Sequence, residues 1–347
     1  MAYRAVTALA LLLATPAFAE ETLNALVWCD HTDPALLAPF EKKFNVKVNV
    51  KAYEGTAAGM AILDQSKPGD WDVLVIDAVD VQRAVAAGKL AEIPADKLPT
   101  ADFFPELVMA ANNTVGGKTY AVTEKFGYNT ISYDKTKVDP KDMDDMATLT
   151  SGKYDGKIGI YDYYLPVLGL VALGQGMKSA DITADTLPKL KAPLLALRKS
   201  AKQVSDVVSS QTALATGDVD IIVGGGEWLT AVLAKDNPNL DWTIPKQGAL
   251  RWAQSIGVVA GTAKPDLALE FVQYITSPEG QALLAQASCY WGMPANMKAG
   301  DLLTPEAKAV LRWDQQPDYL KRAQIYPIPD AKTDQAMQDM WTAMLNQ

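Results

Sequence analysis

Aromatic and acidic side chains gather just after the predicted strands of this 347-residue chain. Aromatic faces attract organic cations by about 0.5 to 2 kcal/mol each when water is excluded, and a carboxylate pairs with the same charge. Together they predict a binding site for a small organic cation, and the alternative for any single ring is a place in the ordinary core. The aromatic candidates are Trp28, Tyr161, Tyr163, Tyr164, Trp228, Trp252, Tyr290 and Trp291, and the acidic candidates are Asp30, Asp77 and Asp162.

Two bases and a pair of acids leave other chemistry open. Lys125 and Arg251 lie near residues 121–126 and 251–255, where the chain is predicted to cross between two lobes. There they would reach a carboxylate on a ligand with charges of both signs. The alternative for each base is a solvated surface charge. A second class of function is an exported hydrolase with Asp30 and Asp77 as acid and base, which requires both carboxyls within reach of one bond. We favour binding without chemistry.

The first 19 residues have the three parts of a secretory signal peptide: Arg4, an apolar run over residues 5–13, and Ala-Phe-Ala before Glu20. The run is too short to span a bilayer, and no later segment reaches the roughly 20 apolar residues required. The alternative, an amphipathic first helix, lacks the polar face that such a helix needs. We therefore expect a soluble mature protein in the periplasm, beginning at Glu20.

The net charge and the cysteine content restrict the classes of partner and ligand that this protein is expected to bind. The formal net charge is −9, and it becomes −10 without residues 1–19, which carry one base and no acid; this disfavours nucleic acid and anionic membranes. Cys29, Cys289 and His31 have none of the short spacings of a structural zinc site, and residues 224–226 lack the Lys and Ser/Thr of a phosphate-binding loop. We expect no metal and no cofactor. The two cysteines either form a disulfide or remain buried thiols.

Strands and helices alternate along the first part of the chain. Residues 23–28, 46–53 and 72–76 have strand patterns, and residues 34–44 have the pattern of an amphipathic helix. Such alternation predicts a mostly parallel sheet with helices on its faces, where ligands bind beyond the carboxyl ends of the strands. The residues just after two of these strands, 28–31 and 77–80, are therefore expected at one edge of the sheet.

The chain is longer than the range over which one hydrophobic core usually grows, so two lobes are expected. The second lobe is predicted between about residues 126 and 246, with strands at 157–161 and 219–223 and helices at 187–199 and 209–216. A strand at 255–260 and helices at 265–275 and 278–286 follow it. The chain thus crosses between the lobes more than once, near residues 121–126 and 251–255.

An ordered set of motifs resembles the spermidine/putrescine-binding proteins of bacterial ABC importers. The resemblance covers most of the mature chain and implies an α/β, two-lobed periplasmic binding protein fold, in which each lobe is a mostly parallel sheet flanked by helices. It also implies a protein that is not an enzyme, closes around one solute and delivers it to a permease in the inner membrane. The motifs are Trp28-x-Asp30, residues 40–44, 71–75, 217–219 and 244–248, and the segment 268–278.

The family's binding residues are matched only in part. Trp28 and Asp30 match an aromatic and acidic pair after the first strand, and Trp252 matches an aromatic wall. The family's acid two residues beyond that wall is Gln254 here. The resemblance also places Cys289 near the ligand on the lobe that holds Cys29, which is compatible with a disulfide and leaves two buried thiols as the alternative.

Three further family positions are changed. The Trp and Asp expected after the strand at 219–223 fall on Gly225 and Trp228, and a Glu expected after Asp162 falls near Pro166. Asp77 stands where the family commonly has Ser. A diamine buried in a cleft needs an acid at each end, and an unpaired ammonium costs on the order of 2 to 5 kcal/mol. We therefore expect monoamines, betaines or amino-acid-like solutes to bind better than spermidine or putrescine.

These inferences define the expected layout. Residues 20–123 and 252–305 would form the N-terminal lobe, residues 124–251 and 306–347 would form the C-terminal lobe, and the protein would be a monomer. The ligand, a small amine or zwitterion, would contact Trp28, Asp30, His31, Asp77, Lys125, Asp162, Tyr163, Trp228, Trp252, Gln254 and Trp291.

Overall fold

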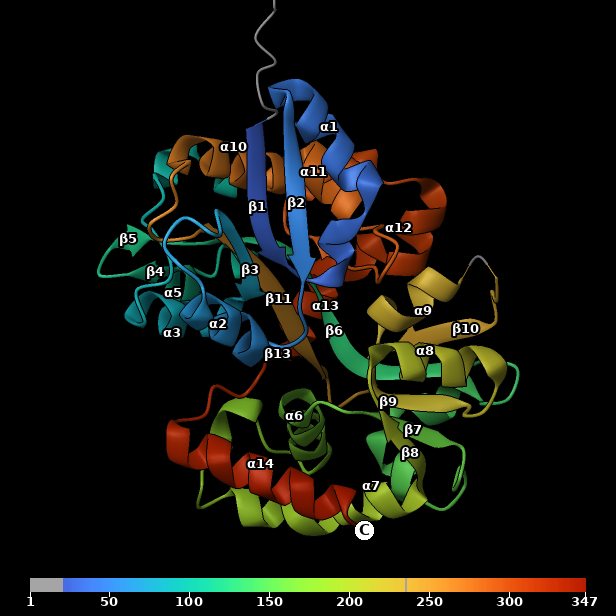
Figure 1. The fold of residues 1–347 in the computed structure, drawn as a ribbon. Coiled ribbons are helices and arrows are strands. Elements are labelled where there is room, and N and C mark those ends of the chain that lie inside the picture. Colours follow the sequence, from blue (N-terminus) through green and yellow to red (C-terminus); the bar gives the residue numbers. More distant parts are fainter. Residues whose placement is uncertain (1–20, 235) are drawn as a thin grey trace, which may run out of the picture.

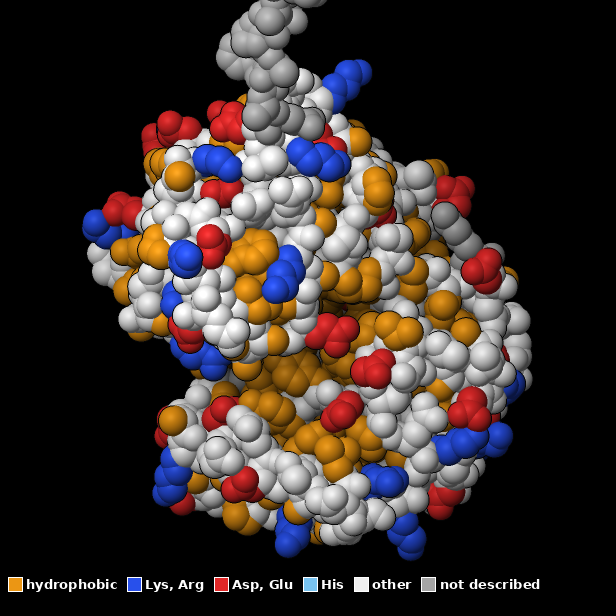
Figure 2. Space-filling view, in the orientation of Figure 1, with side chains coloured by type: hydrophobic (Ala, Val, Ile, Leu, Met, Phe, Trp, Pro, Cys, Tyr) orange, Lys and Arg blue, Asp and Glu red, His pale blue; other side chains and the backbone are white. Residues whose placement is uncertain are grey.

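Two lobes joined by long strands form the molecule. The computed structural model describes residues 21–234 and 236–347, so the predicted signal peptide lies outside the described residues. Figure 1 shows the lobes meeting where β6 (Val122–Asp134) and β11 (Ala249–Val258) run from one to the other. Figure 2 shows a hollow between them, with hydrophobic side chains inside it. The two-lobed α/β fold expected from the sequence is confirmed.

The N-terminal lobe is built on the sheet order β2-β1-β3-β11. Strand β1 is parallel to both of its neighbours, and β11 returns antiparallel to β3. Helices lie on both sides of this sheet (Figure 1). Besides β11, the strands of this lobe are β1 (Glu21–Val27), β2 (Val46–Ala52), β3 (Val73–Asp77), β4 (Thr114–Val115), β5 (Lys118–Thr119) and β12 (Met293–Pro294). Its helices are α1 (Pro34–Phe44), α2 (Thr56–Gln65), α3 (Val81–Ala86), α4 (Pro105–Val108), α5 (Ala110–Asn113), α10 (Pro265–Thr276) and α11 (Pro278–Leu284).

The C-terminal lobe repeats this plan. Strands β9, β7 and β8 are parallel to one another, and β6 pairs antiparallel with β9 on one side and β10 on the other. Besides β6, the strands of this lobe are β7 (Ile158–Tyr161), β8 (Ala201–Ser205), β9 (Ile221–Gly225) and β10 (Leu240–Thr243). Its helices are α6 (Tyr164–Gly174), α7 (Lys191–Ser200), α8 (Val207–Thr216), α9 (Glu227–Leu233) and α14 (Ala331–Leu345).

The sequence pattern explains where α1 begins and ends. The Asp33 carboxylate accepts a hydrogen bond from the backbone N–H of Ala35 at 2.9 Å, and Pro34 fills the first helical position, where it has no N–H to waste. Asn45 then adopts a left-handed conformation with φ of 52° and ends the helix. The predicted helix at 34–44 thus has the observed bounds, and it returns the chain into β2 beside β1.

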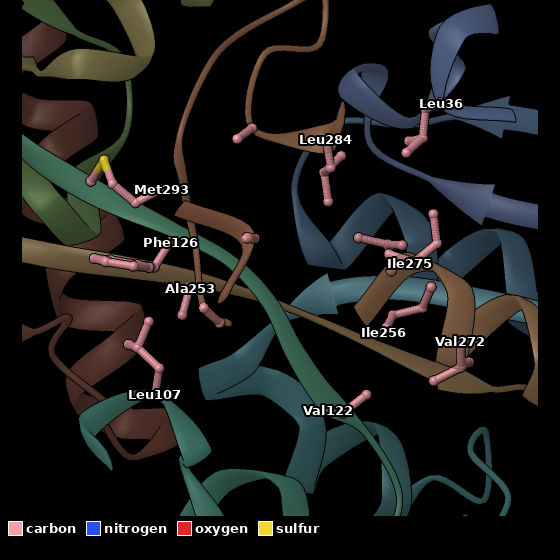
Figure 3. Packing of buried hydrophobic residues seen from close by; sticks show 14 of the residues in the cluster. Leu36, Leu107, Val122, Phe126, Ala253, Ile256, Val272, Ile275, Leu284 and Met293 are labelled. Atoms are coloured by element: carbon pink, nitrogen blue, oxygen red, sulfur yellow. The ribbon is translucent and has the colours of Figure 1, made fainter. Parts of the chain in front are cut away.

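The connecting strands are buried along their whole length. Every residue of β6 and of β11 is buried, and the two strands pair antiparallel from Val122–Ile256 to Asn129–Leu250, with an irregularity after Gln254. Figure 3 shows Phe126 and Ile256 on these strands within the core cluster of the N-terminal lobe. Burying one such side chain contributes roughly 1.5 to 3 kcal/mol. The two predicted crossings therefore lie inside continuous, rigidly packed strands.

A third connection between the lobes follows the last helices of the N-terminal core. Helices α12 (Pro305–Leu311) and α13 (Gln316–Arg322) bury Leu311 and Leu320 in that core, whereas Met337 of α14 belongs to the core of the other lobe. Between them, β13 (Ala323–Ile325) pairs parallel with β11. The lobe boundaries given above stay a proposal, and this packing favours moving the last one from residue 305 to about residue 323.

Candidate functional site

A cavity of about 280 Å³ opens between the two lobes, where strands of both end. In Figure 2 the hollow is lined mainly by hydrophobic side chains with acidic residues at its mouth. Its lining comes from the ends of β1, β2, β3 and β7, from the middle of β6 and β11, and from the segments around residues 207, 228, 289 and 326. The strand-end rule applied to the sequence therefore located the site.

Eight aromatic rings among the described residues line the cavity, and several pack against each other as pairs. Trp28 meets Tyr53 edge-on with 6.1 Å between ring centroids, and Tyr161 lies 5.1 Å from Trp228. These pairs hold the rings in place, so that their faces are preorganised for a cation. The eight are Trp28, Tyr53, Tyr161, Tyr163, Trp228, Trp252, Tyr290 and Tyr326.

Asp77, at the end of β3, is the buried acid of this cavity. Its side chain is 5% exposed, and its Oδ2 has no hydrogen-bond partner among the described residues. Burial, with a smaller contribution from the nearby Asp80 carboxylate, raises the pKa of Asp77 to about 8. A cation placed against Asp77 would supply the missing partner and favour its charged form.

Two neutral side chains in the wall also carry unpartnered polar atoms. The Gln254 amide donates to the hydroxyl of Tyr290, which leaves its Oε1 without a partner among the described residues. The indole Nε1 of Trp228, from the start of α9, is likewise buried and unpartnered within the described part of the chain. Both residues line the cavity. Buried polar groups of this kind are normally satisfied, so they point to a ligand or to water.

Two further acids lie at the mouth of the cavity and are exposed. Glu54 follows β2, and Asp162 follows β7 on the other lobe. Asp162 accepts a hydrogen bond from the indole N–H of Trp341 at 2.8 Å, which fixes the carboxylate beside the cleft. Among the described residues, no Lys or Arg lines the cavity. Its charge is therefore suited to a cationic solute.

Asp30 and Lys125 lie behind this wall rather than in it. Both are fully buried, and the Lys125 ammonium donates to Asp30 Oδ2 and to the carbonyl of Tyr290, each at 2.9 Å. The ammonium lies 4.3 Å from the centroid of the Tyr290 ring, whose residue lines the cavity. We therefore assign neither residue a ligand contact, since each charge already has its partner.

His31 extends this buried ion pair to Glu124. Its Nδ1 lies 2.9 Å from Asp30 Oδ1, and its Nε2 lies 3.0 Å from Glu124 Oε1 as an ion pair without hydrogen-bond alignment. Against the lowering effect of burial, Glu124 and Asp30 raise the pKa of His31 to about 10. Burial alone would raise the pKa of Asp30, but Lys125 and His31 hold it well below its usual range. We call these four residues the buried ion ladder.

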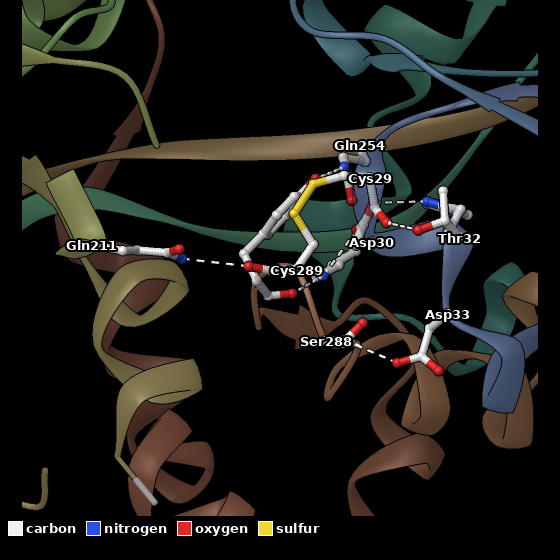
Figure 4. The surroundings of a disulfide bond; sticks show 11 residues. Cys29, Asp30, Thr32, Asp33, Gln211, Gln254, Ser288 and Cys289 are labelled. Carbon is white, nitrogen blue, oxygen red and sulfur yellow. Dashed lines mark hydrogen bonds and ion pairs between the residues drawn. A yellow bond between two sulfur atoms is a disulfide. The ribbon is translucent and has the colours of Figure 1, made fainter. Parts of the chain in front are cut away.

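Cys29 and Cys289 form a disulfide at the edge of the cavity. Figure 4 shows it beside Asp30 and Gln254, with Ser288 donating its backbone N–H to Asp33 at 2.9 Å. The bond links the loop after β1 to the segment after α11, although 260 residues separate the two cysteines. It therefore fixes the loops that carry two rings of the wall.

The structure brings most of the sequence-predicted site residues together. Asp30, His31 and Lys125 form the ion ladder instead, and Trp291 packs partly buried against the N-terminal core. Arg251 and Tyr164, considered as further candidates, do not line the cavity either. The predicted site residues that line it are Trp28, Asp77, Asp162, Tyr163, Trp228, Trp252 and Gln254.

Sequence reasoning missed Tyr53, Glu54, Asn129 and Tyr326. Tyr53 ends the predicted strand at 46–53 and Glu54 follows it, so the strand-end rule applied once more would have found them. Asn129 sits within β6, and its Oδ1 accepts from the hydroxyl of Tyr326. Neither residue follows a strand predicted from the sequence, so no local signal marks them.

Within residues 21–234 and 236–347, no group of three His, Cys, Asp or Glu side chains is placed to hold a metal ion. Within the same residues, no helix combines the length and apolar character needed to cross a bilayer.

Known proteins of the same fold share this organisation. Residues 35–310 match the model of the bacterial extracellular solute-binding protein family. The chain is 26% identical to the spermidine/putrescine-binding periplasmic protein of Escherichia coli (strain K12), over 83% of this chain and 81% of that protein.

Two solved structures are similar over nearly the whole length. A putative spermidine/putrescine ABC transporter from Listeria monocytogenes has a TM-score of 0.80 at 21% identity, covering 94% of this chain and 99% of that one. The corresponding substrate-binding protein of Streptococcus pneumoniae has a TM-score of 0.79 at 19% identity, covering 94% and 98%. The hydrolase alternative is thereby overturned: the chain belongs to the bacterial extracellular solute-binding proteins and is the solute-binding component of an ABC importer rather than an enzyme.

Proposed function

We propose that this protein captures a small organic amine in the cavity between its lobes and delivers it to its permease. The observation that carries the proposal is Asp77, a buried carboxylate with an unpartnered oxygen in a wall of aromatic rings. A cation there gains ring contacts of about 0.5 to 2 kcal/mol each and a charge partner. Relatives named for spermidine and putrescine support an amine as the solute.

The charge pattern favours a solute with one desolvated ammonium. Asp77 is buried, whereas Glu54 and Asp162 are exposed at the mouth, where water screens any pairing with a second ammonium. In the described part of the wall a carboxylate on the ligand would find no counter-charge, because Lys125 is paired with Asp30 and Arg251 lies outside the wall. Of the solutes expected from the sequence, monoamines therefore fit better than zwitterions.

Capture follows from the position of the cavity. Asp77 and Trp28 belong to one lobe, and Asp162 and Trp228 to the other, so a bound amine contacts both. Ligand contacts made only in a closed form shift the population toward that form. We expect closure on binding, a monomer in solution, and a periplasmic mature protein that begins at Glu20.

Calorimetry of the mature protein with n-butylamine, putrescine and spermidine tests this proposal. We expect one site per chain, no turnover, and a loss of affinity of about 2 to 4 kcal/mol in Asp77→Asn, because the ammonium loses its charge partner. Glu227→Gln is the matched control, since Glu227 is buried with a pKa also raised to about 8 by burial but does not line the cavity. Failure of every amine to bind would refute the proposal.

A mass spectrum of the solute that co-purifies with the native protein provides an independent check. An amine released on gentle denaturation would support the proposed function. A stoichiometric anion or sugar would contradict it, because neither would satisfy Asp77. Small-angle scattering with saturating amine should show compaction, and an unchanged radius would contradict lobe closure.

A further inference from the structure

Three unpartnered polar atoms in the cavity wall define the chemistry of the ligand more narrowly. They are Asp77 Oδ2, Gln254 Oε1 and Trp228 Nε1, on side chains that are 5%, 1% and 5% exposed. None has a hydrogen-bond partner among the described residues. A buried donor or acceptor without a partner is costly, so a ligand that satisfies all three is favoured over one that leaves any unpaired.

The two acceptors lie side by side. Asp77 and Gln254 are directly opposite each other in the antiparallel pairing of β3 with β11, so their side chains leave the same face of the sheet. The Gln254 amide is oriented by its donation to the Tyr290 hydroxyl, which turns Oε1 away from that partner. Two neighbouring acceptors require two N–H donors. A primary or secondary ammonium has them, and a quaternary ammonium does not.

The donor comes from the opposite lobe. Trp228 begins α9, and its ring packs against Tyr161 with 5.1 Å between centroids. An indole N–H can only donate, so it requires an acceptor on the ligand. Among the described residues, the lining holds no Lys or Arg and three acids, Asp77, Glu54 and Asp162. A neutral oxygen therefore suits this position better than a carboxylate.

We infer that the ligand is a primary or secondary amine that carries a neutral oxygen acceptor, as in an amino alcohol or an amino amide. Its ammonium donates to Asp77 and Gln254, and its hydroxyl or carbonyl oxygen accepts from Trp228. This inference rests on the proposed function and names the class of amine. It excludes choline-like quaternary cations, which leave both acceptors unpaired.

A matched series of ligands tests the inference on the mature protein. Calorimetry would compare n-alkylamines of three to six carbons with the ω-amino alcohols of equal length and with the N,N,N-trimethyl form of each alcohol. At the best length we expect the amino alcohol to bind at least about fivefold more tightly than the alkylamine, and the trimethyl form at least about tenfold more weakly than the amino alcohol.

A variant separates the donor from the shape of the wall. Trp228→Phe keeps a ring but removes the N–H, so the amino alcohol should lose its advantage and bind this variant only as tightly as the alkylamine does. Trp71→Phe is the matched control, because the Trp71 indole donates to Ser66 and lies outside the cavity. Thermal melting of each variant verifies folding, and the wild-type ratio tests the inference even if Trp228→Phe does not fold.

The outcomes distinguish this inference from the proposed function. If alkylamines and amino alcohols bind wild type equally, or if the trimethyl forms bind best, the inference is wrong and amine capture stands. If no amine in the series binds while an anion or sugar does, the proposed function is wrong as well. A selective gain from the oxygen that disappears in Trp228→Phe supports both.

Discussion

Asp30 and Asp77 lie at the ends of neighbouring strands of one sheet, and both are buried, yet their surroundings differ in kind. Asp30 is paired with Lys125 and His31, which hold its pKa well below the usual range. Asp77 has an unpartnered oxygen among the described residues, and burial raises its pKa to about 8. The first charge is already neutralised by the protein, and we propose that a ligand neutralises the second. Burial of an acid thus does not reveal its role until its partners are known.

Breaking the ion ladder should produce the largest effect, and it should be on folding. Lys125→Met removes the ammonium that Asp30 and the Tyr290 carbonyl bind, so we expect a loss of about 3 to 5 kcal/mol in the free energy of unfolding. Urea denaturation measures it. The corresponding variant at the other acid is Asp77→Asn, and its free energy of unfolding at pH 7 should be nearly the same as that of the wild type. A stable Lys125→Met protein with lost affinity would show that Lys125 serves the ligand after all.

Removing the disulfide should have the next largest effect. Replacing both cysteines with Ala removes a cross-link between positions 260 apart in the sequence, which increases the conformational entropy of the unfolded chain. We expect a loss of roughly 2 to 4 kcal/mol in the free energy of unfolding. Affinity should fall less, because Trp28 and Tyr290 are also held by Tyr53 and by Gln254. Denaturation with and without reductant measures the first effect, and calorimetry the second. Wild-type stability that reductant does not change would contradict the expectation.

Local sequence patterns predicted much of the fold. They also predicted that Asp30 and Asp77 follow strand ends, but not which of the two is paired. Helix α1 and the strands that lead to Trp28 and Asp77 follow from apolar periodicity, and the strand-end rule located the cavity. That rule could not separate Asp30 from Asp77, because their partners come from elsewhere in the chain: Lys125 from β6 and Gln254 from β11. The resemblance carried Asp30 over as a ligand contact, but in the structure Asp30 is paired with Lys125. Tertiary pairing decides which acid is free.

The pH dependence caused by Asp77 should be of intermediate size. As pH rises, its contribution to the stability of the free protein should fall, whereas the affinity for an amine should increase. In the free protein its pKa of about 8 lies above the ordinary value of 3.8 for an Asp side chain, so its contribution to stability is complete below about pH 4 and is lost as pH rises through 8. Binding of an amine requires the ionised form. Affinity should therefore fall by up to about tenfold for each pH unit below 8, with proton release on binding at pH 7.

Calorimetry in buffers of different ionisation enthalpy measures that proton release. Asp77→Asn should abolish it, and Glu227→Gln should retain it, because the Glu227 carboxylate accepts from the backbone N–H of Tyr128 and lies outside the cavity. Proton release that persists in Asp77→Asn would assign the titrating group elsewhere. Asp30 should take no part, since its pKa is held well below this range.

The smallest effect should come from Trp28 in the cavity wall. Trp28 follows β1, lies two residues before Asp30, and lines the same cavity as Asp77. Its indole donates to the Tyr53 hydroxyl at 3.3 Å, which orients the ring for the ligand. Trp28→Ala should weaken amine binding by about 0.5 to 2 kcal/mol through loss of a ring face, and Trp28→Phe should recover most of it. If Trp28→Phe binds as poorly as Trp28→Ala, the hydrogen bond to Tyr53 rather than the ring face determines affinity, and the wall acts by positioning.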